Sequence, residues 1–239
     1  MNSLAKLAID AHGGMDRWKQ FDTASADLVQ GGVLWQVKAQ AGTLDVTTVT
    51  VGLRGEWASH SPFGATGRRS RFEPGRVAIE SADGVVLEEL REPRQSFAGH
   101  TLQTPWTRLQ LAYFAGCAMW TYLNTPFLLA WPGVLCEELS PWHENGERWR
   151  RLGVGYPKSI ATHSAKQTLY FDESGLLKRH DYDVEIAGGT PGAHYIDAYT
   201  EVSGIKFPTL RRIFARQADA SVNREPLVVS IDLSNIRLA

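Results

Sequence analysis

Ile160–Phe214 reads IATHSAKQTLYFDESGLLKRHDYDVEIAGGTPGAHYIDAYTEVSGIKFPTLRRIF and predicts four antiparallel strands in one meander. Its extended runs are rich in β-branched and aromatic residues, and glycine-containing turn sequences separate them. The expected turns are Asp172–Gly175, Ala187–Gly192 and Ser203-Gly204. The expected strands are Ile160–Phe171, Leu176–Ile186, Ala193–Val202 and Ile205–Phe214. The segment therefore predicts a protein dominated by antiparallel β-structure.

The turns also predict which side chains share a face, because alternate residues of a strand point to opposite faces. We place His180 opposite Gln167 and Tyr199, and Tyr182 opposite Asp197. A slip of one residue in the loop at 187–192 would exchange the faces of the last two strands. The apolar and aromatic face is predicted to hold His163, Gln167, Leu169, His180, Tyr182, Val184, Tyr195, Asp197, Tyr199, Leu210, Arg212 and Phe214. The face predicted to meet solvent holds Thr168, Arg179, Asp181, Asp183, Glu185, His194, Thr200 and Arg211.

Further strands are expected on both sides of one helix, with period-two patterns between turn residues. They are Thr23–Val29, Val33–Ala39, Leu44–Leu53, Glu56–Ser61, Arg68–Glu73, Arg76–Ser81, Val85–Arg91, Val134–Leu139, Glu147–Val154 and Leu227–Leu238. Pro93–Trp106 is a long connection of the kind that often forms a lid or a binding loop. No linker, repeat or low-complexity segment interrupts the 239 residues, so we expect a single domain, 1–239.

Arg108–Leu123 is predicted to be a helix with Thr107 as its N-cap. It is apolar almost all round, so other structure must surround it. The apolar stretch Leu109–Leu135 contains two prolines and several polar residues, which favours a buried helix and an apolar loop over a membrane span. We therefore expect a single curved antiparallel sheet, a half-barrel, that wraps a buried central helix and leaves a cavity between them.

Composition excludes several partners and cofactors. The net charge is −1 and no basic stripe is interleaved with aromatic residues, so nucleic acid is not expected. No Gly-x-Gly-x-x-Gly or P-loop pattern occurs, and we expect no cofactor. Cys117 and Cys136 show neither metal-ligand spacing nor disulfide density, which indicates a reducing compartment. Because the chain opens without a signal-like segment, we expect a cytoplasmic protein without stable membrane insertion.

The opening helix with His12-Gly13-Gly14 through Trp18, the strand meander, the central helix and the hairpin Phe171–Leu176 together resemble the LolA/LolB-type half-barrel. That family includes carriers that sort outer-membrane lipoproteins. The same architecture resembles a cofactor-free enzyme of violacein biosynthesis. The resemblance implies a half-barrel around a hydrophobic ligand. Sorting carriers are exported, whereas this sequence shows no export signal and no lipidation cysteine, so we do not expect lipoprotein sorting.

His180 is the candidate proton-transfer residue, since an imidazole in a partly apolar cavity titrates near neutral pH. Asp197 and Tyr199 would orient it, and a purely structural hydrogen bond to Tyr199 is the alternative. The candidate ligand contacts are His163, Gln167, Tyr182, Tyr195, Arg212 and, on the helix, Tyr113 and Trp120. We expect no metal site, because His194 is predicted to lie on the opposite face from His163 and His180.

These residues predict a protein that encloses a hydrophobic or aromatic small molecule. The first hypothesis is a cofactor-independent acid–base enzyme, and the second is a carrier that binds a lipid or an apolar metabolite unchanged. A carrier requires a cavity lined almost wholly by carbon. An enzyme requires at least two titratable side chains within hydrogen-bond reach inside it. The sequence does not indicate the oligomeric state.

Overall fold

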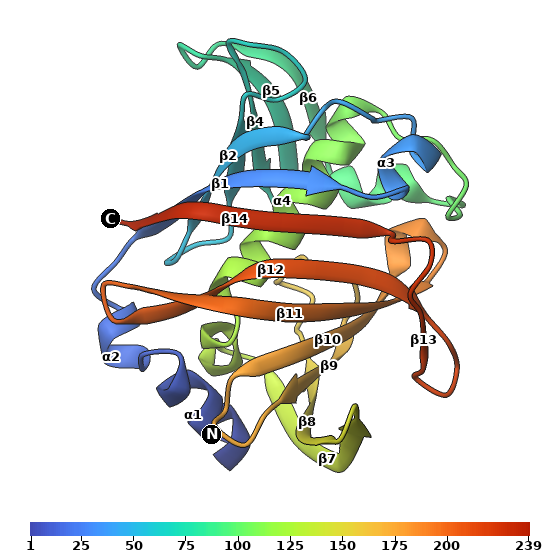
Figure 1. Ribbon diagram of the computed structural model, residues 1–239. Helices are drawn as coiled ribbons and strands as arrows, with labels where there is room; N and C mark the ends of the chain where they lie inside the picture. The colour runs from blue at the N-terminus through green and yellow to red at the C-terminus, as the bar shows by residue number, and fades with distance from the viewer.

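The computed structural model describes residues 1–239 and contains one open antiparallel sheet. The strand order is β6-β5-β4-β3-β2-β1-β14-β12-β11-β10-β9-β8-β7, and the short β13 pairs with β12. The C-terminal strand β14 therefore lies between β1 and β12 and joins the N-terminal and C-terminal strands of the sheet (Figure 1). The sheet curves without closing, which confirms the predicted half-barrel.

The helices are α1 (Ser3–Ala11), α2 (Met15–Trp18), α3 (Leu34–Val37) and α4 (Arg108–Asn124), with 3-10 turns η1 (Pro93–Phe97), η2 (Phe127–Ala130) and η3 (Glu185–Ala187). The strands of the first half are β1 (Thr23–Gly31), β2 (Val46–Gly52), β3 (Ala58–Ser61), β4 (Arg68–Glu73), β5 (Arg76–Ser81) and β6 (Val86–Arg91). Those of the second half are β7 (Leu135–Glu144), β8 (Glu147–Gly155), β9 (Lys166–Phe171), β10 (Leu177–Val184), β11 (Thr190–Val202), β12 (Ile205–Arg216), β13 (Val222–Asn223) and β14 (Val229–Leu238).

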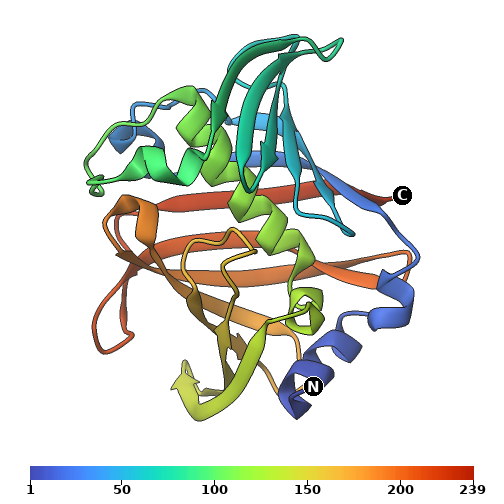
Figure 2. The ribbon, with the colours of Figure 1, turned by 180° about the vertical axis from the view of Figure 1, so that it is seen from behind.

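Helix α4 crosses the concave side of the sheet (Figure 2), as its all-round apolar sequence predicts. Thr107 caps it: its hydroxyl accepts the backbone N–H of Gln110, and the Gln110 side chain accepts the N–H of Thr107. Every residue from Gln110 to Asn124 is buried. Gly116 lies so close to Phe72 of β4 that a Cβ atom there would overlap it. No helix of this chain is both long enough and apolar enough to cross a bilayer.

One predicted strand is absent and another begins later than predicted. Val33–Ala39 forms the short helix α3, because Gly32, with φ of +105°, ends β1 and the chain then turns back. The neighbouring residues Leu34 and Trp35 both point inward, whereas a strand would send them to opposite faces. The segment before Lys166 does not join β9 as predicted, and its buried residues Thr162 and Ser164 instead bond to nearby backbone carbonyls.

The predicted register is wrong at the turn between β10 and β11. His180 pairs with His194 rather than Tyr199, and Tyr182 pairs with Gly192 rather than Asp197. The offset is five residues, an odd number, so β11 and β12 show the opposite faces from those predicted. The last hairpin does have its predicted register, with Asp197 opposite Leu210 and Tyr195 opposite Arg212.

The error has a local cause. The turn is η3 followed by Gly188 and Gly189, both with positive φ, and β11 already begins at Thr190. Pro191 is tolerated in β11 because the pairing with β12 starts only at Gly192, so the missing N–H removes no ladder bond on that side. In the first hairpin Gln167 pairs with Tyr182, and His180 pairs with Leu169. That shift is even, so the faces of β9 and β10 stay as predicted.

Candidate functional site

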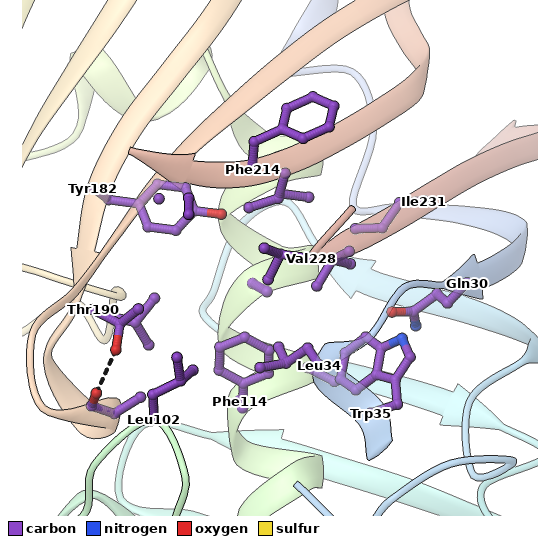
Figure 3. Close-up of a pocket in the computed structure, with 18 of the residues that line it drawn as sticks. Gln30, Leu34, Trp35, Leu102, Phe114, Tyr182, Thr190, Phe214, Val228 and Ile231 are labelled. Atoms are coloured by element: carbon purple, nitrogen blue, oxygen red, sulfur yellow. Dashed lines mark hydrogen bonds between the residues drawn. The ribbon is translucent and has the colours of Figure 1, made fainter. Parts of the chain in front are cut away.

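A cavity of about 110 Å³ lies between α4 and the inner face of the sheet. Of its 22 lining residues 18 are hydrophobic, and none carries a charge. Figure 3 shows Phe114 of α4 and Leu34 and Trp35 of α3 around it, with Tyr182 of β10 on the opposite side. The cavity is therefore an apolar compartment between the central helix, the sheet and the short helix α3.

The sequence of α4 explains the space. Phe114, Ala118 and Tyr122 recur at helical spacing and face the cavity, together with Ala115 and Met119. Two of these five side chains are alanines, and their small size leaves empty space in the middle of the stripe. Large residues at 114 and 122 close the space on both sides.

The mouth of the cavity lies where the ends of β11 and β12 approach the connection between η1 and α4. Pro191 and Ala215 are exposed there, and Leu102 is half-buried. The buried Lys38 holds this connection: its ammonium donates to the carbonyls of Thr101 and Thr104 at 3.0 and 3.2 Å. The long connection predicted as a binding loop thus contributes Leu102 and Trp106 to the cavity wall.

One side of the cavity is polar. The hydroxyls of Tyr182 and Tyr122 lie 2.6 Å apart, and that of Tyr122 lies 3.1 Å from Nε2 of His163. Burial raises the pKa of both phenols and lowers the pKa of His163 to about 3. All three groups are therefore neutral around pH 7. The cavity meets two uncharged phenols at this side.

Behind these phenols lies what we call the inner polar cluster, which consists of His163, His180, His194, Gln167 and Arg211. All five side chains are at least nine-tenths buried. His180 Nε2 lies 2.5 Å from Oε1 of Gln167, and since the Gln167 amide nitrogen donates to the Ser164 carbonyl, His180 must be the donor in that pair. Burial, with the positive charge of Arg211, holds the pKa of His180 and His194 well below the usual range. None of the five lines the cavity.

Arg211 has no carboxylate partner. One of its nitrogens donates to the Tyr122 carbonyl at 3.1 Å, and another lies 3.4 Å from Nε2 of His194. The Tyr122 carbonyl would normally accept the N–H of residue 126, but Pro126 has none. Arg211 therefore caps the C-terminal end of α4, where a positive charge is favourable. Burial nevertheless lowers its pKa to about 10.

Several predicted site residues lie away from the cavity. Asp197 is exposed and accepts the N–H of Ala198. Tyr195 donates to Glu144 at 2.5 Å, and Arg212 pairs with Asp232. These residues lie on the outer face because β11 and β12 are inverted relative to the prediction, and none of them can meet a ligand in this cavity.

The other predicted residues serve the scaffold. Tyr199 donates to the Leu177 carbonyl at 2.7 Å and does not contact His180 as its predicted register required. On α4, Trp120 donates to the carbonyls of Gly52 and Gly55, and Tyr113 accepts from Arg94. Both lie on the side of α4 away from the cavity. Of all the predicted ligand contacts, Tyr182 alone lines it.

The three histidines of the meander share one face, contrary to the prediction that separated His194 from the others. The rings of His180 and His194 are 6.0 Å apart between centroids. His163 lies against Tyr182 at 4.7 Å. No three His, Cys, Asp or Glu side chains come together in a way that could hold a metal ion. The reason given for the absence of a metal was wrong, and the absence itself stays a prediction.

The residues that sequence reasoning missed are Gln30, Trp35, Trp106 and Tyr122. A signal existed for Tyr122, which shares a helical stripe with Phe114 and Ala118. The opposite stripe, with Tyr113 and Trp120, was chosen for ligand contact instead. Nothing local marks Gln30 or Trp106, because the cavity forms only when α3 and the long connection fold over the sheet.

Solved structures share this fold. A DUF1329 family protein from Desulfovibrio piger superposes with a TM-score of 0.54 at 12% identity, covering 99% of this chain and 92% of that one. A putative outer-membrane lipoprotein-sorting protein domain from Vibrio parahaemolyticus gives 0.54 at 10% identity, with 98% and 90% covered. A LolA superfamily protein from Nitrosomonas europaea gives 0.53 at 12% identity, with 98% and 93% covered.

Sequence comparison adds nothing to this likeness, because no family model and no curated protein matches the chain. The resemblance to the violacein-pathway enzyme stays a prediction. At identities this low the superpositions establish architecture and not activity. The protein has a LolA-like half-barrel fold.

Proposed function

We propose that this protein binds an apolar small molecule in the cavity under α4 and carries it without changing it. The observation that supports this is the lining, in which 18 of 22 residues are hydrophobic and none is charged. Enclosed apolar pockets with a few polar groups are the usual form of small-molecule sites. A ligand that removes this surface from water gains free energy in proportion to the apolar area buried.

The size of the cavity limits the ligand. A volume of about 110 Å³ is somewhat smaller than the dry cavity of ~150 Å³ that admits benzene in an engineered protein. The closed form therefore accepts one ring or the end of an alkyl chain. A longer molecule would extend out of the cavity through the mouth beside Pro191 and Ala215, whose side chains are exposed.

Acid–base catalysis is the second candidate, and the chain from Tyr182 through Tyr122 to His163 is what favours it. Two titratable groups do lie within hydrogen-bond reach at the cavity wall. However, burial raises the pKa of Tyr182 and lowers that of His163 to about 3, so both move away from neutral pH. A general acid or base works best when its pKa is near the working pH. His180, the predicted base, is separated from the cavity. Carriage without turnover is therefore the better-supported proposal.

The test is to fill the cavity and measure, by fluorescence, binding of N-phenyl-1-naphthylamine, an uncharged apolar dye that would place one ring in the cavity and extend its other rings through the mouth. Ala118→Phe places a ring in the middle of the lining stripe, and we expect at least a tenfold loss of affinity. Ala130→Phe adds the same side chain at an exposed position outside the cavity and should bind like the wild type. Overpacking by the phenylalanine should cost ~1–3 kcal/mol of stability. Ala118→Leu is the milder variant to use if Ala118→Phe does not fold.

Melting curves of each variant show whether lost binding reflects a filled cavity or an unfolded protein. Equal affinity in the folded wild type and both Ala118 variants would contradict the proposal. Mass spectrometry of the ligand recovered after long incubation tests the second candidate. A product that appears with the wild type, and not with Ala118→Phe, would replace carriage by catalysis.

A further inference from the structure

Two N–H donors in the cavity wall have no acceptor in the protein. Nε2 of Gln30 and Nε1 of Trp106 are both buried without a hydrogen-bond partner, in residues only 9% and 4% exposed. Both residues line the cavity. Figure 3 shows the Gln30 side chain beside Trp35, at the end of the cavity away from Tyr182. Buried donors are rarely left unpaired, so two of them in one ligand-sized space require an explanation.

The position of Trp106 is fixed by its surroundings. Its backbone N–H donates to the Lys38 carbonyl at 3.0 Å, and its own carbonyl accepts from Gln40 at 2.5 Å. The Lys38 ammonium lies 4.5 Å from the centre of the indole ring, and Phe114 packs against the ring at 4.8 Å. The indole is therefore held in place while its N–H has no partner. Trp35 differs, because its Nε1 donates to the Gly31 carbonyl at 3.1 Å.

The acceptor that would satisfy these donors must be uncharged. No charged side chain lines the cavity. Lys38 and Arg211 lie behind the wall residues Trp106 and Tyr122, do not line the cavity, and donate to backbone carbonyls instead. A carboxylate in the apolar cavity would lose its hydration without gaining a counter-charge. A carbonyl oxygen has lone pairs for N–H donors and a much smaller cost of desolvation.

We propose that the ligand is an uncharged apolar molecule with a carbonyl oxygen, such as an ester, that accepts hydrogen bonds from Gln30 and Trp106. This rests on the proposed function and names the class of ligand. Both donors belong to residues that line the same cavity, and they favour a ligand with an acceptor over a pure hydrocarbon. The absence of a charged side chain from the lining disfavours an ionised acid. The phenol of Tyr182 offers a further uncharged partner on the opposite side.

The experiment compares methyl octanoate, undecane and nonanoate, which have equal numbers of non-hydrogen atoms, by displacement of N-phenyl-1-naphthylamine at pH 8. Each is titrated into the wild type, Gln30→Leu and Trp106→Phe. For each ligand the affinity of the variant is compared with that of the wild type, so the free energy of hydrating the free ligand cancels. We expect each variant to weaken methyl octanoate roughly tenfold, the effect of one lost hydrogen bond, and to leave undecane unchanged or slightly tighter. The wild type should bind methyl octanoate at least tenfold more tightly than nonanoate.

Trp35→Phe is the matched control, because it makes the same substitution in the same cavity at an indole that already has an acceptor. It should change the affinities of ester and undecane by the same factor. Equal effects of Gln30→Leu and Trp106→Phe on ester and undecane would overturn the proposal while leaving apolar binding intact. Tighter binding of nonanoate than of the ester would overturn it as well. Failure of the dye and all three ligands to bind would instead reject the proposed function.

Discussion

Strands β10 and β11 carry a buried polar cluster on each face, and the two clusters are built in opposite ways. The inner polar cluster has three histidines and Arg211, with no carboxylate bonded to them. The outer cluster centres on Arg179, whose guanidinium donates to both oxygens of Asp181 at 2.7 and 2.8 Å and to Glu144 at 3.1 Å. Arg179 is fully buried and Asp181 nearly so, which corrects the prediction that these two residues meet solvent, whereas Asp183 and Glu185 are exposed as predicted.

The two clusters are both buried, and they differ in whether their charged groups have partners of opposite charge. In the outer cluster, burial acts to raise the pKa of Glu144. The hydrogen bonds from Tyr195 and Trp142, with the charge of Arg179, outweigh it and hold that pKa below its usual value. In the inner cluster no such partner exists, so the imidazoles stay neutral. The face next to the cavity is polar without anionic charge, while the outer face keeps full charges by pairing them.

The largest effect that should separate the two clusters is that of acid. Burial lowers the pKa of His12, His60, His163, His180 and His194 in the fold. The unfolded chain therefore binds more protons, and the stability that these histidines contribute is complete above pH ~6.5 and falls as the pH drops. The loss continues toward the folded pKa values, which are about 4 for His12 and His60 and about 3 for His163. At pH 5 each histidine that stays neutral costs about 2 kcal/mol relative to pH 8. We expect the free energy of unfolding in urea to fall by several kcal/mol between pH 7 and pH 5.

A variant outside both clusters measures how much one buried neutral histidine contributes to this pH dependence. His60→Leu replaces a buried histidine whose Nε2 has no partner and which lies on β3, away from both clusters. The unfolding of this variant should take up about one proton fewer than that of the wild type, so its unfolding free energy should fall less between pH 7 and pH 5. A wild type that is as stable at pH 5 as at pH 7 would contradict the neutral-histidine account of the inner cluster.

Removing Arg179 should have the next largest effect. Arg179→Leu leaves Asp181 buried with a hydrogen bond from the Tyr170 hydroxyl at 2.8 Å and with Arg216, at 3.8 Å, as its nearest cation. Breaking a buried ion pair in this way costs ~3–5 kcal/mol. Urea unfolding at pH 7 measures it. Arg212→Leu is the control, because Arg212 and its partner Asp232 are both partly exposed and such pairs contribute ~0–1 kcal/mol. If both variants lose the same stability, the outer cluster does not act as a buried ion pair.

The sequence analysis assigned the inner and outer faces of β11 the wrong way round. Period-two alternation predicted the faces within each strand correctly, and the Ser203-Gly204 turn gave the right pairing of β11 with β12. The pairing of β9 with β10 was shifted by an even number of residues and kept its faces, whereas the odd shift at the turn after Val184 sent His194 and Arg211 inward. A histidine and an arginine are not residues that hydrophobicity assigns to a core, so composition could not correct the error.

The helix and the sheet were predictable because their signals are local and repeated. Thr107 and Gln110 mark the start of α4, and its unbroken apolar run marks its burial. The cavity was not predictable in detail, because its wall combines α3, the connection carrying Trp106 and the strands around Gln30. Contacts between segments so far apart in the sequence leave no pattern in any one of them.

Arg211→Leu should cost less than Arg179→Leu, which sharpens the contrast between a paired and an unpaired guanidinium. The variant leaves the Tyr122 carbonyl at the end of α4 without a donor, a loss of ~1–3 kcal/mol. Removing a buried charge that has no counter-ion offsets part of this, as the lowered pKa of Arg211 indicates. We expect a net loss of about 1–2 kcal/mol in urea unfolding at pH 7. A loss as large as that of Arg179→Leu would mean that Arg211 is paired more strongly than its contacts show.

The smallest effect concerns the two phenols between the cavity and the inner cluster. Tyr182→Phe removes the 2.6 Å bond to Tyr122 but leaves Tyr122 its bond to His163, so only one hydrogen bond is lost, about 1 kcal/mol. Tyr122→Phe removes both bonds and leaves His163 Nε2 without a partner, so it should cost roughly twice as much. Undecane affinity should be unchanged in both, because the rings that it contacts remain. If Tyr182→Phe is the more destabilising of the two, the chain of hydrogen bonds does not run from the cavity through Tyr122 to His163, and the neutral inner cluster is not coupled to the ligand site.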